Sequence, residues 1–492
     1  MDASVQPAQN SRTPMQLGAP ALNRVLEVAR LGGARSAFVE WRYIDIDFRS
    51  EHSFFYSTTF RRYPSICQRV HFFAAELTAG LGNLSEIADT YLGYVVMRPL
   101  PTSPVGRTML SPPPHLKSAI LCSTTDEVHL RGVTLSVTGV PFVGQDGQYL
   151  RCSHSCLWSA SYHAHLQRRS PRHLPRDVRE AAMGGEVVGR QTPHEGLSVA
   201  QLLSALQNLG FSPERVPLPR TREDSVRSET SSLPSTFARY ANSGIPTIAY
   251  NRSHSWLVIG YYFAGPPEVK DHDTPNKQLQ TSNHDATCLV VHDDVQGPYL
   301  ESLGRDDYLN PWANLDYERS GWRAAIPALP SKVYITAERA EWLGRERLTF
   351  IIDKLSAAAQ HNCCTRIPKN RLRYRTHVTT GAKFKQRVAD RLPSELADFY
   401  RTMHLPKYLW VVEAIDEELA KNDKPCVVGE ALIDATAHHL ASADSPALLA
   451  RNVGGDAKAT SLDHQETLSV VLDDLKPYPS ALTGPVYPLI RN

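Results

Sequence analysis

The chain lacks several features that would place it in a functional class at once. Its longest apolar run, from Trp256 to Gly265, is far shorter than the roughly 18 residues that a membrane helix needs. Neither sign of charge dominates, because 53 Lys and Arg stand against 51 Asp and Glu. No nucleotide-binding glycine fingerprint and no internal repeat are present. We therefore expect no transmembrane segment, no nucleic-acid partner, no membrane partner and no cofactor.

Cysteine is also sparse. The eight cysteines among 492 residues show neither density nor regular spacing, and the first residues lack the basic stretch and apolar core of a secretory signal. We predict a cytoplasmic protein with reduced thiols. The sequence leaves its oligomeric state open.

The length predicts more than one domain, because 492 residues exceed what a single hydrophobic core usually serves. Changes in residue pattern indicate four parts. We expect a flexible tail over residues 1–35, with one helix over 21–31, and a β-rich N-terminal module over 36–140. A catalytic domain over 141–330 and a C-terminal α/β domain over 331–492 follow.

One stretch, residues 145–166, combines a glycine-containing turn with a helical pattern. Its apolar positions at helical spacing are Cys156, Leu157, Ala160 and Ala164. This places Cys152 at or near a helix N-terminus, where the partial positive charge favours the nucleophilic thiolate.

Two later stretches supply the partners that a thiolate needs. A short buried strand is predicted over 244–250, a turn over 251–253, and a return strand that begins at His254. Another buried strand begins at Cys288 and ends in the pair Asp293–Asp294. The order along the chain is therefore Gln, Cys, His, Asp.

This order resembles that of the papain-like cysteine peptidases, and among them the bacterial branch that includes the double-glycine peptidases. In that family a Gln donates to the oxyanion, the Cys opens the central helix, the His begins a strand ending in Gly-Tyr, and an Asp or Asn orients the His. The resemblance covers roughly residues 140–330. The matching positions are Gln145, Cys152, His254 and Asp293.

The chain departs from the family pattern at two points. Ser153 follows the cysteine where Gly or Ala is frequent, and Asp293–Asp294 stands where Asp-Pro is frequent. Neither departure removes a catalytic group. Two choices stay open, namely Gln145 against Gln148 and Asp293 against Asp294, and His292 also competes at the acidic position.

The resemblance implies an α+β fold whose papain-like catalytic domain packs a central Cys-bearing helix on an antiparallel β-sheet. It also implies a cysteine hydrolase that cleaves a peptide or isopeptide bond of a protein or peptide substrate, through a Cys-His-Asp triad and an acyl-enzyme. The same triad could perform acyl transfer or deamidation. A catalytically inactive fold that acts as a binding module is the other alternative.

Several residues of metal-ligand type crowd the predicted helix. They spread around the helix instead of converging from paired loops, so we predict no metal. Cys363–Cys364 is likewise unsuitable by spacing. The helix residues concerned are Cys152, His154, Cys156, His163 and His165.

Other charged groups have less specific interpretations. A set of arginines in the N-terminal module could bind an anionic substrate end, but scattered arginines are more often solvated or paired. Three C-terminal carboxylates at predicted strand ends are more often solvent-facing than part of a site. These groups are Arg61, Arg62, Arg69, Arg98 and Arg107, and Glu413, Glu430 and Asp434.

Overall fold

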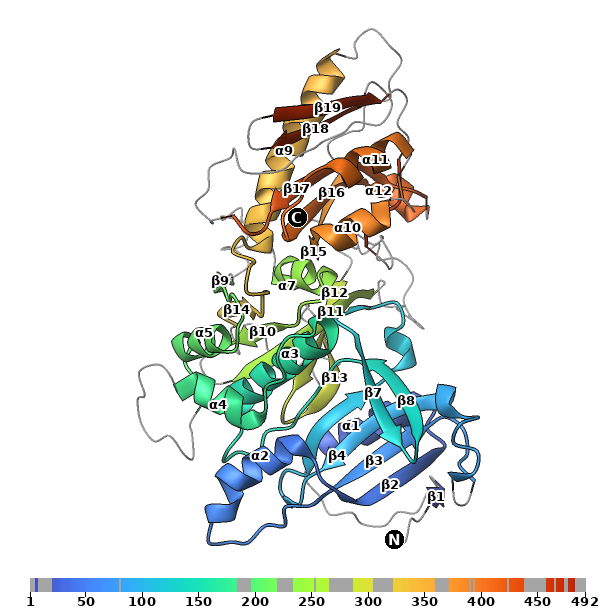
Figure 1. The fold of residues 1–492 in the computed structure, drawn as a ribbon, viewed down its shortest axis with the longest axis vertical. Helices are drawn as coiled ribbons and strands as arrows, with labels where there is room; N and C mark the ends of the chain where they lie inside the picture. The colour runs from blue at the N-terminus through green and yellow to red at the C-terminus, as the bar shows by residue number, and fades with distance from the viewer. Residues whose placement is uncertain are drawn as a thin grey trace, which may run out of the picture. The chain divides into compact units, whose positions relative to one another are not determined.

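The computed structural model describes residues 5–7, 20–78, 81–183, 196–218, 233–251, 254–264, 286–303, 322–358, 371–388, 391–392, 394–422, 424–437, 457–463, 466–472 and 477–482. The chain divides into two compact units, whose elements are labelled in Figure 1. Unit 1 comprises residues 1–224 and 244–328, and unit 2 comprises 225–243 and 329–492. Every strand pair in the described residues is antiparallel, and helices accompany the sheets, so the protein is of the α+β class.

The N-terminal part of unit 1 is built on a five-stranded sheet with the order β1-β2-β3-β4-β5. The hairpin β7–β8 buries alternate side chains in the same core as Phe38, Phe73 and Tyr94 of this sheet. Helix α2 (Ile46–Phe54) follows β2, and its first turn is capped by Asp45, which accepts from the Phe48 N–H at 3.0 Å. The strands are β1 (Val5–Pro7), β2 (Ser36–Tyr43), β3 (Cys67–Phe73), β4 (Tyr91–Met97), β5 (Val105–Leu110), β7 (Thr124–Leu130) and β8 (Val133–Gly139).

Helix α1 (Pro20–Leu31) confirms the helix predicted over residues 21–31 of the N-terminal tail. Its Val25 and Val28 are buried. Arg24 donates through Nε to the Pro298 carbonyl at 3.1 Å and through Nη2 to the Tyr299 carbonyl, both in strand β13 (Gly297–Leu303). The apolar face of this helix is thus covered by the rest of unit 1, which a composition rich in Ser, Pro and Gln before residue 20 did not indicate.

The second sheet of unit 1 has seven strands in the order β13-β12-β11-β10-β14-β9, and β6 also pairs with β11. Helix α3 (Cys152–Arg168) packs on β11 and β10, and α4 and α5 pack beside it (Figure 1). Helix α5 begins with a side-chain cap, because the Ser198 hydroxyl accepts from the Gln201 N–H. The remaining elements are β6 (Ile120–Leu121), α4 (Pro175–Met183), α5 (Val199–Asn208), β9 (Val216–Pro217), β10 (Thr247–Tyr250), β11 (Ser255–Ala264), β12 (Ala286–Asp293) and β14 (Ala324–Pro327).

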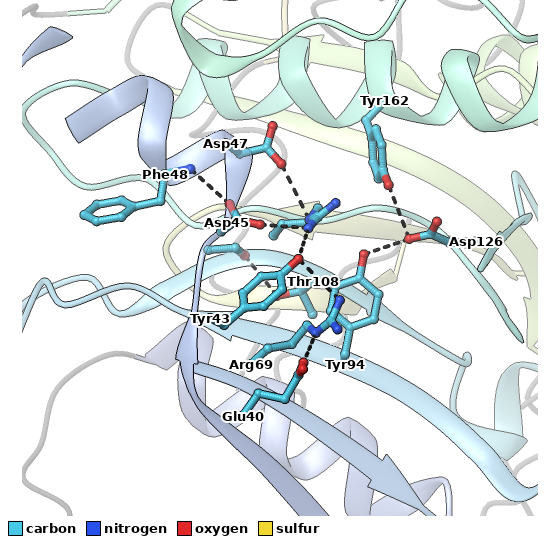
Figure 2. A network of polar contacts seen from close by, with 12 residues as sticks. Glu40, Tyr43, Asp45, Asp47, Phe48, Arg69, Tyr94, Thr108, Asp126 and Tyr162 are labelled. Carbon is cyan, nitrogen blue, oxygen red and sulfur yellow. Dashed lines mark hydrogen bonds and ion pairs between the residues drawn. The ribbon is translucent and has the colours of Figure 1, made fainter. Parts of the chain in front are cut away.

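A buried polar network joins the N-terminal sheet to the middle of α3. As Figure 2 shows, the hydroxyl groups of Tyr94 on β4 and Tyr162 on α3 converge on Asp126 of β7, at 2.7 and 3.3 Å from its Oδ2. Trp158 of α3 donates from its indole to Asp47 of α2 at 3.2 Å. Because each partner is buried, these directional contacts hold the helix in one position along the sheet.

Unit 2 contains the three-stranded sheet β15-β16-β17 and the hairpin β18–β19. Its strands are antiparallel, which corrects the predicted α/β arrangement for residues 331–492. Helix α7, which the sequence analysis assigned to the catalytic domain, packs on α9 and β15 in this unit. The bounds are α7 (Leu233–Asn242), α9 (Ala337–Ala358), β15 (Leu372–Thr380), α10 (Gly381–Val388), α11 (Ser394–Thr402), β16 (Tyr408–Asp416), α12 (Glu417–Lys421), β17 (Val427–Asp434), β18 (Ala457–Asp463) and β19 (Glu466–Leu472).

Of the three carboxylates in unit 2 that were expected to face solvent, two are buried. Glu413 and Glu430 lie opposite each other on β16 and β17, and both are fully buried. Arg391 lies 3.1 Å from Glu430 and 3.6 Å from Glu413, so the burial of charge is compensated by pairing. Asp434 caps the following turn by accepting from the Thr436 N–H at 2.8 Å. No described helix, including the 22-residue α9, is long and apolar enough to cross a membrane.

Candidate active site

Cys152 is the first residue of α3, as predicted, and its thiol is free and partly exposed. The loop before it is held by Asp146, whose Oδ1 accepts from the backbone N–H groups of Gln148, Tyr149 and Leu150 at 2.7 to 2.9 Å. The N–H groups of the first helical turn have no partner within the helix and point toward its N-terminal end. The thiol therefore lies where a developing negative charge is stabilised.

His254 lies one residue before strand β11, at the position that the sequence predicts. Its backbone N–H donates to Asn251 Oδ1 at 2.6 Å, and its carbonyl accepts from the Asn251 N–H at 3.0 Å, so a closed turn presents the histidine. The Trp256 ring packs against the imidazole at a centroid distance of 4.5 Å and an interplanar angle of 82°. The imidazole side chain keeps 21% of its surface exposed, which leaves room for a reacting group.

Two carboxylates lie beside the same ring nitrogen. Asp293 is the last residue of β12, and its Oδ2 lies 3.1 Å from His254 Nε2. Its other oxygen, Oδ1, accepts from the N–H groups of Val295 and Gln296 at 2.8 and 2.9 Å. Asp294 Oδ1 lies 3.4 Å from His254 Nε2, but neither of its oxygens has a hydrogen-bond partner among the residues that the structure describes. The geometry therefore favours Asp293 as the residue that orients the imidazole.

The electrostatics of the site match this geometry. Burial alone would lower the pKa of His254, but hydrogen bonds with Asp293 and Cys152 and the charges of the two aspartates raise it to about 10. Burial opposes ionisation of Asp293, yet the hydrogen bond and charge of His254 lower its pKa. For Asp294, burial outweighs the attraction of His254 and raises the pKa to about 7. At neutral pH the imidazole is therefore charged and Asp293 is ionised.

The competing cysteine and histidine are unsuited to this chemistry. Cys156 is buried, and burial and the charge of Asp294 raise its thiol pKa well above the ordinary value. His292 is also buried, with its pKa lowered to about 3 by that burial, and its ring packs against Phe142 and Tyr299. Both side chains fill the core.

The two candidate glutamines differ in their surroundings. Gln145 is partly buried, and its backbone N–H donates to the Asp294 carbonyl at 3.2 Å, which places it at the edge of the site. Gln148 is exposed, and its backbone belongs to the turn around Asp146. The loop thus brings Gln145, Cys152, His254 and Asp293 into one region of unit 1.

A pair of buried serines was missed by the sequence analysis as a functional feature. Ser153 and Ser255 each follow a candidate catalytic residue, and their hydroxyl groups lie 2.9 Å apart. This hydrogen bond ties the first turn of α3 to the first residue of β11, and so fixes Cys152 relative to His254. The signal was present as the departure from Gly or Ala after the cysteine, but its partner is 102 positions away.

In the described part of the chain, one group of residues could hold a metal ion by distance alone. It consists of His254, Asp293 and Asp294, whose potential ligand atoms lie within 4.8 Å of one another. The histidines and cysteines of α3 form no such set there. The contact between the imidazolium and the carboxylate also accounts for the closeness of His254 Nε2 and Asp293 Oδ2. The other oxygen of Asp293, Oδ1, already accepts from two backbone N–H groups.

Comparison of the chain with protein-family models, with curated proteins and with solved structures found no match. The chemistry of the site therefore follows from its own residues. Its distinctive feature is a thiol and a carboxylate that share one imidazole.

Proposed function

We propose that this protein is a cysteine hydrolase that cleaves a peptide or isopeptide bond through an acyl-enzyme on Cys152. The observation that carries the proposal is the imidazole of His254, which lies 3.1 Å from Asp293 Oδ2 and whose pKa is raised by Asp293 and by the neighbouring Cys152. Because Nε2 contacts Asp293, Nδ1 is the nitrogen left to exchange a proton with the thiol. A nucleophile, a base and an orienting group in contact are what nucleophilic catalysis requires.

The roles of the residues follow from their positions. The proton of Cys152 lies on His254 in a thiolate–imidazolium pair, so the thiolate attacks the carbonyl carbon, and the imidazolium then donates that proton to the leaving amine as the carbon–nitrogen bond breaks. Water, deprotonated by the same imidazole, attacks the thioester, which releases the acid and restores the thiol. Asp293 stays ionised and holds the ring in place through Nε2.

The oxyanion that forms during each attack needs hydrogen-bond donors. The Cys152 backbone N–H lies at the start of α3, where it is not consumed by the helix. The Gln145 side chain is proposed as the second donor, because its backbone already contacts the residue beside Asp293. Donors of this kind contribute about 10²- to 10³-fold in rate.

The resemblance to papain-like peptidases supports the substrate class, since α3 packs on an antiparallel sheet that carries His254 and Asp293 on neighbouring strands. The six cysteines among the described residues are all free, which supports a reducing compartment and the proposal that the protein is cytoplasmic. Acyl transfer and deamidation differ from hydrolysis only in the acceptor or the leaving group, so they stay as alternatives. The partly exposed imidazole beside Asp293 favours catalysis over the alternative of an inactive binding module, because perturbed pKa values cluster at functional sites.

The test is alkylation of the native protein with sub-stoichiometric iodoacetamide from about pH 5 to 8, the range in which a perturbed thiolate reveals itself, read by intact mass. We expect one fast site at the acidic end. The label should disappear in Cys152→Ala, slow strongly in His254→Ala and persist in the matched control Cys156→Ala. Labelling of Cys152 no faster than an ordinary thiol, or loss of the label in Cys156→Ala alone, would show that the proposed triad is wrong.

A further inference from the structure

The loop that precedes Cys152 is tied to the connection between β4 and β5 in the N-terminal module. Arg98 directly follows β4, and its side chain is buried. Its Nη2 donates to the Gly144 carbonyl at 2.9 Å. The Ser103 hydroxyl donates to the next carbonyl, that of Gln145. Two consecutive carbonyl groups of the loop are therefore held by one short segment of the N-terminal module.

The peptide unit between Gly144 and Gln145 is held at both of its polar ends. Its carbonyl accepts from Arg98, and its N–H donates to the Asp294 carbonyl at 3.2 Å. Because a peptide unit is planar, fixing both ends fixes its orientation, and with it the direction in which the Gln145 side chain leaves the backbone. The approach is close, since a Cβ at position 144 would lie 3.0 Å from the Val105 carbonyl oxygen.

Arg98 is itself held firmly. Its Nη1 lies 3.3 Å from Glu51 Oε2, with the two side chains 1% and 2% exposed, and its Nη2 also donates to the Ser103 carbonyl and hydroxyl at 3.2 and 3.1 Å. Removing a guanidinium and a carboxylate from water adds little net stability, so such a pair is better explained by what it orients. Here the group that it orients is the loop at the proposed oxyanion hole.

We propose that Arg98 and Ser103 are positioning residues for the oxyanion hole, which makes the N-terminal module part of the catalytic apparatus. This rests on the function proposed above. In this role neither residue needs to contact the substrate. Their effect passes through the Gly144–Gln145 peptide to the Gln145 side chain and to the backbone that leads into Cys152.

The test separates two reactions of the same thiol in the full-length protein. Acylation by p-nitrophenyl acetate adds sulfur to a carbonyl, expels p-nitrophenolate and develops negative charge on the carbonyl oxygen. Alkylation by iodoacetamide displaces iodide from a saturated carbon, and no oxyanion forms. A residue that positions the oxyanion hole must therefore affect acylation and spare alkylation.

Two variants and one control make the comparison. Ser103→Ala removes the bond to the Gln145 carbonyl, and Arg98→Met combined with Glu51→Gln removes the buried pair without leaving a lone charge. We expect acylation to slow about tenfold and about a hundredfold, respectively, with alkylation and its pH profile changed less than about twofold. Ser36→Ala is the matched control, because its hydroxyl also donates to a backbone carbonyl, that of Ala75 at 2.6 Å, and both rates should be unchanged.

The outcomes are distinguishable. An unchanged acylation rate in both variants overturns the proposal. A parallel fall of the acylation and alkylation rates also overturns it, because it indicates general damage around Cys152. If the unmodified protein shows no rapid alkylation of Cys152 at acidic pH, the proposed function fails, and the positioning role fails with it.

Discussion

Replacing Asp293 with asparagine is expected to abolish most of the proposed activity, although it preserves the shape of the side chain. Family resemblance alone would lead to a different expectation, since Asp or Asn orients the histidine in papain-like peptidases. The difference lies in how Asp293 is held in this protein. Its Oδ1 accepts from the N–H groups of Val295 and Gln296, so only Oδ2 faces His254.

An asparagine placed here would keep its carbonyl oxygen on the two backbone donors. The opposite orientation would leave both buried N–H groups unsatisfied, at a cost of about 2 to 6 kcal/mol in total. The amide NH₂ would therefore face His254 Nε2, which must then accept a hydrogen bond. The neutral imidazole would carry its proton on Nδ1, the nitrogen that has to receive the proton of Cys152. A wrong tautomer of this kind lowers kcat by about 10⁴-fold in a serine-protease triad.

The loss of the carboxylate also removes one of the interactions that raise the pKa of His254 to about 10. The imidazolium would then lose its proton at lower pH and stabilise the thiolate less, so the fast alkylation of Cys152 at the acidic end of the profile should slow. Stopped-flow release of p-nitrophenolate and pH-dependent alkylation would measure the two effects. Retention of more than about a tenth of the acylation rate in Asp293→Asn would refute the assignment of the hydrogen bonds and the tautomer argument.

Two further predictions concern the surroundings of the triad. Because the pKa of Asp294 is raised from 3.8 to about 7, the folded state binds more protons than the unfolded state in that range, and stability falls as the pH rises through it. Asp294→Asn should therefore raise the free energy of unfolding at pH 8 by on the order of 2 to 4 kcal/mol and change it little at pH 4. Urea titration at the two values of pH measures this difference. Equal effects at both values of pH would contradict this account. Ser153→Ala and Ser255→Ala should each destabilise the protein, and a double-mutant cycle should give a coupling energy of about 1 kcal/mol. Strictly additive effects would mean that their hydrogen bond contributes nothing.

Much of the local structure around the site could be predicted from the sequence. The helical spacing after Cys152, the short strand and turn before His254, and the apolar run that ends at Asp293 are local patterns, and the structure has a helix or strand boundary at each of them. Local backbone preferences and side-chain periodicity operate over a few residues, so they can be recognised in the sequence alone.

Contacts between residues that are distant in the sequence could not be predicted in this way. The helix predicted over residues 21–31 is confirmed as α1, but its attachment to β13 could not be predicted, because Arg24 donates to carbonyl groups that lie more than 250 positions later. The arginines interpreted as a candidate anion site are largely paired inside unit 1. Arg69 pairs with Glu40, Arg98 with Glu51, and Arg107 with Asp45 and Asp47.

The sequence by itself determined which residue types begin and end the elements of the site, and therefore named Cys152, His254 and Asp293 as candidates. The tertiary structure distinguished between equivalent neighbours. Asp293 and Asp294 are adjacent in sequence, but only the Asp293 side chain accepts from backbone N–H groups in the described part of the chain. Gln145 and Gln148 differ in the partner of their backbone N–H, which is the Asp294 carbonyl for Gln145 and the Asp146 side chain for Gln148. Hydrogen bonds and burial depend on groups that the fold brings together from distant segments, so only the folded chain sets the charge and orientation of each candidate.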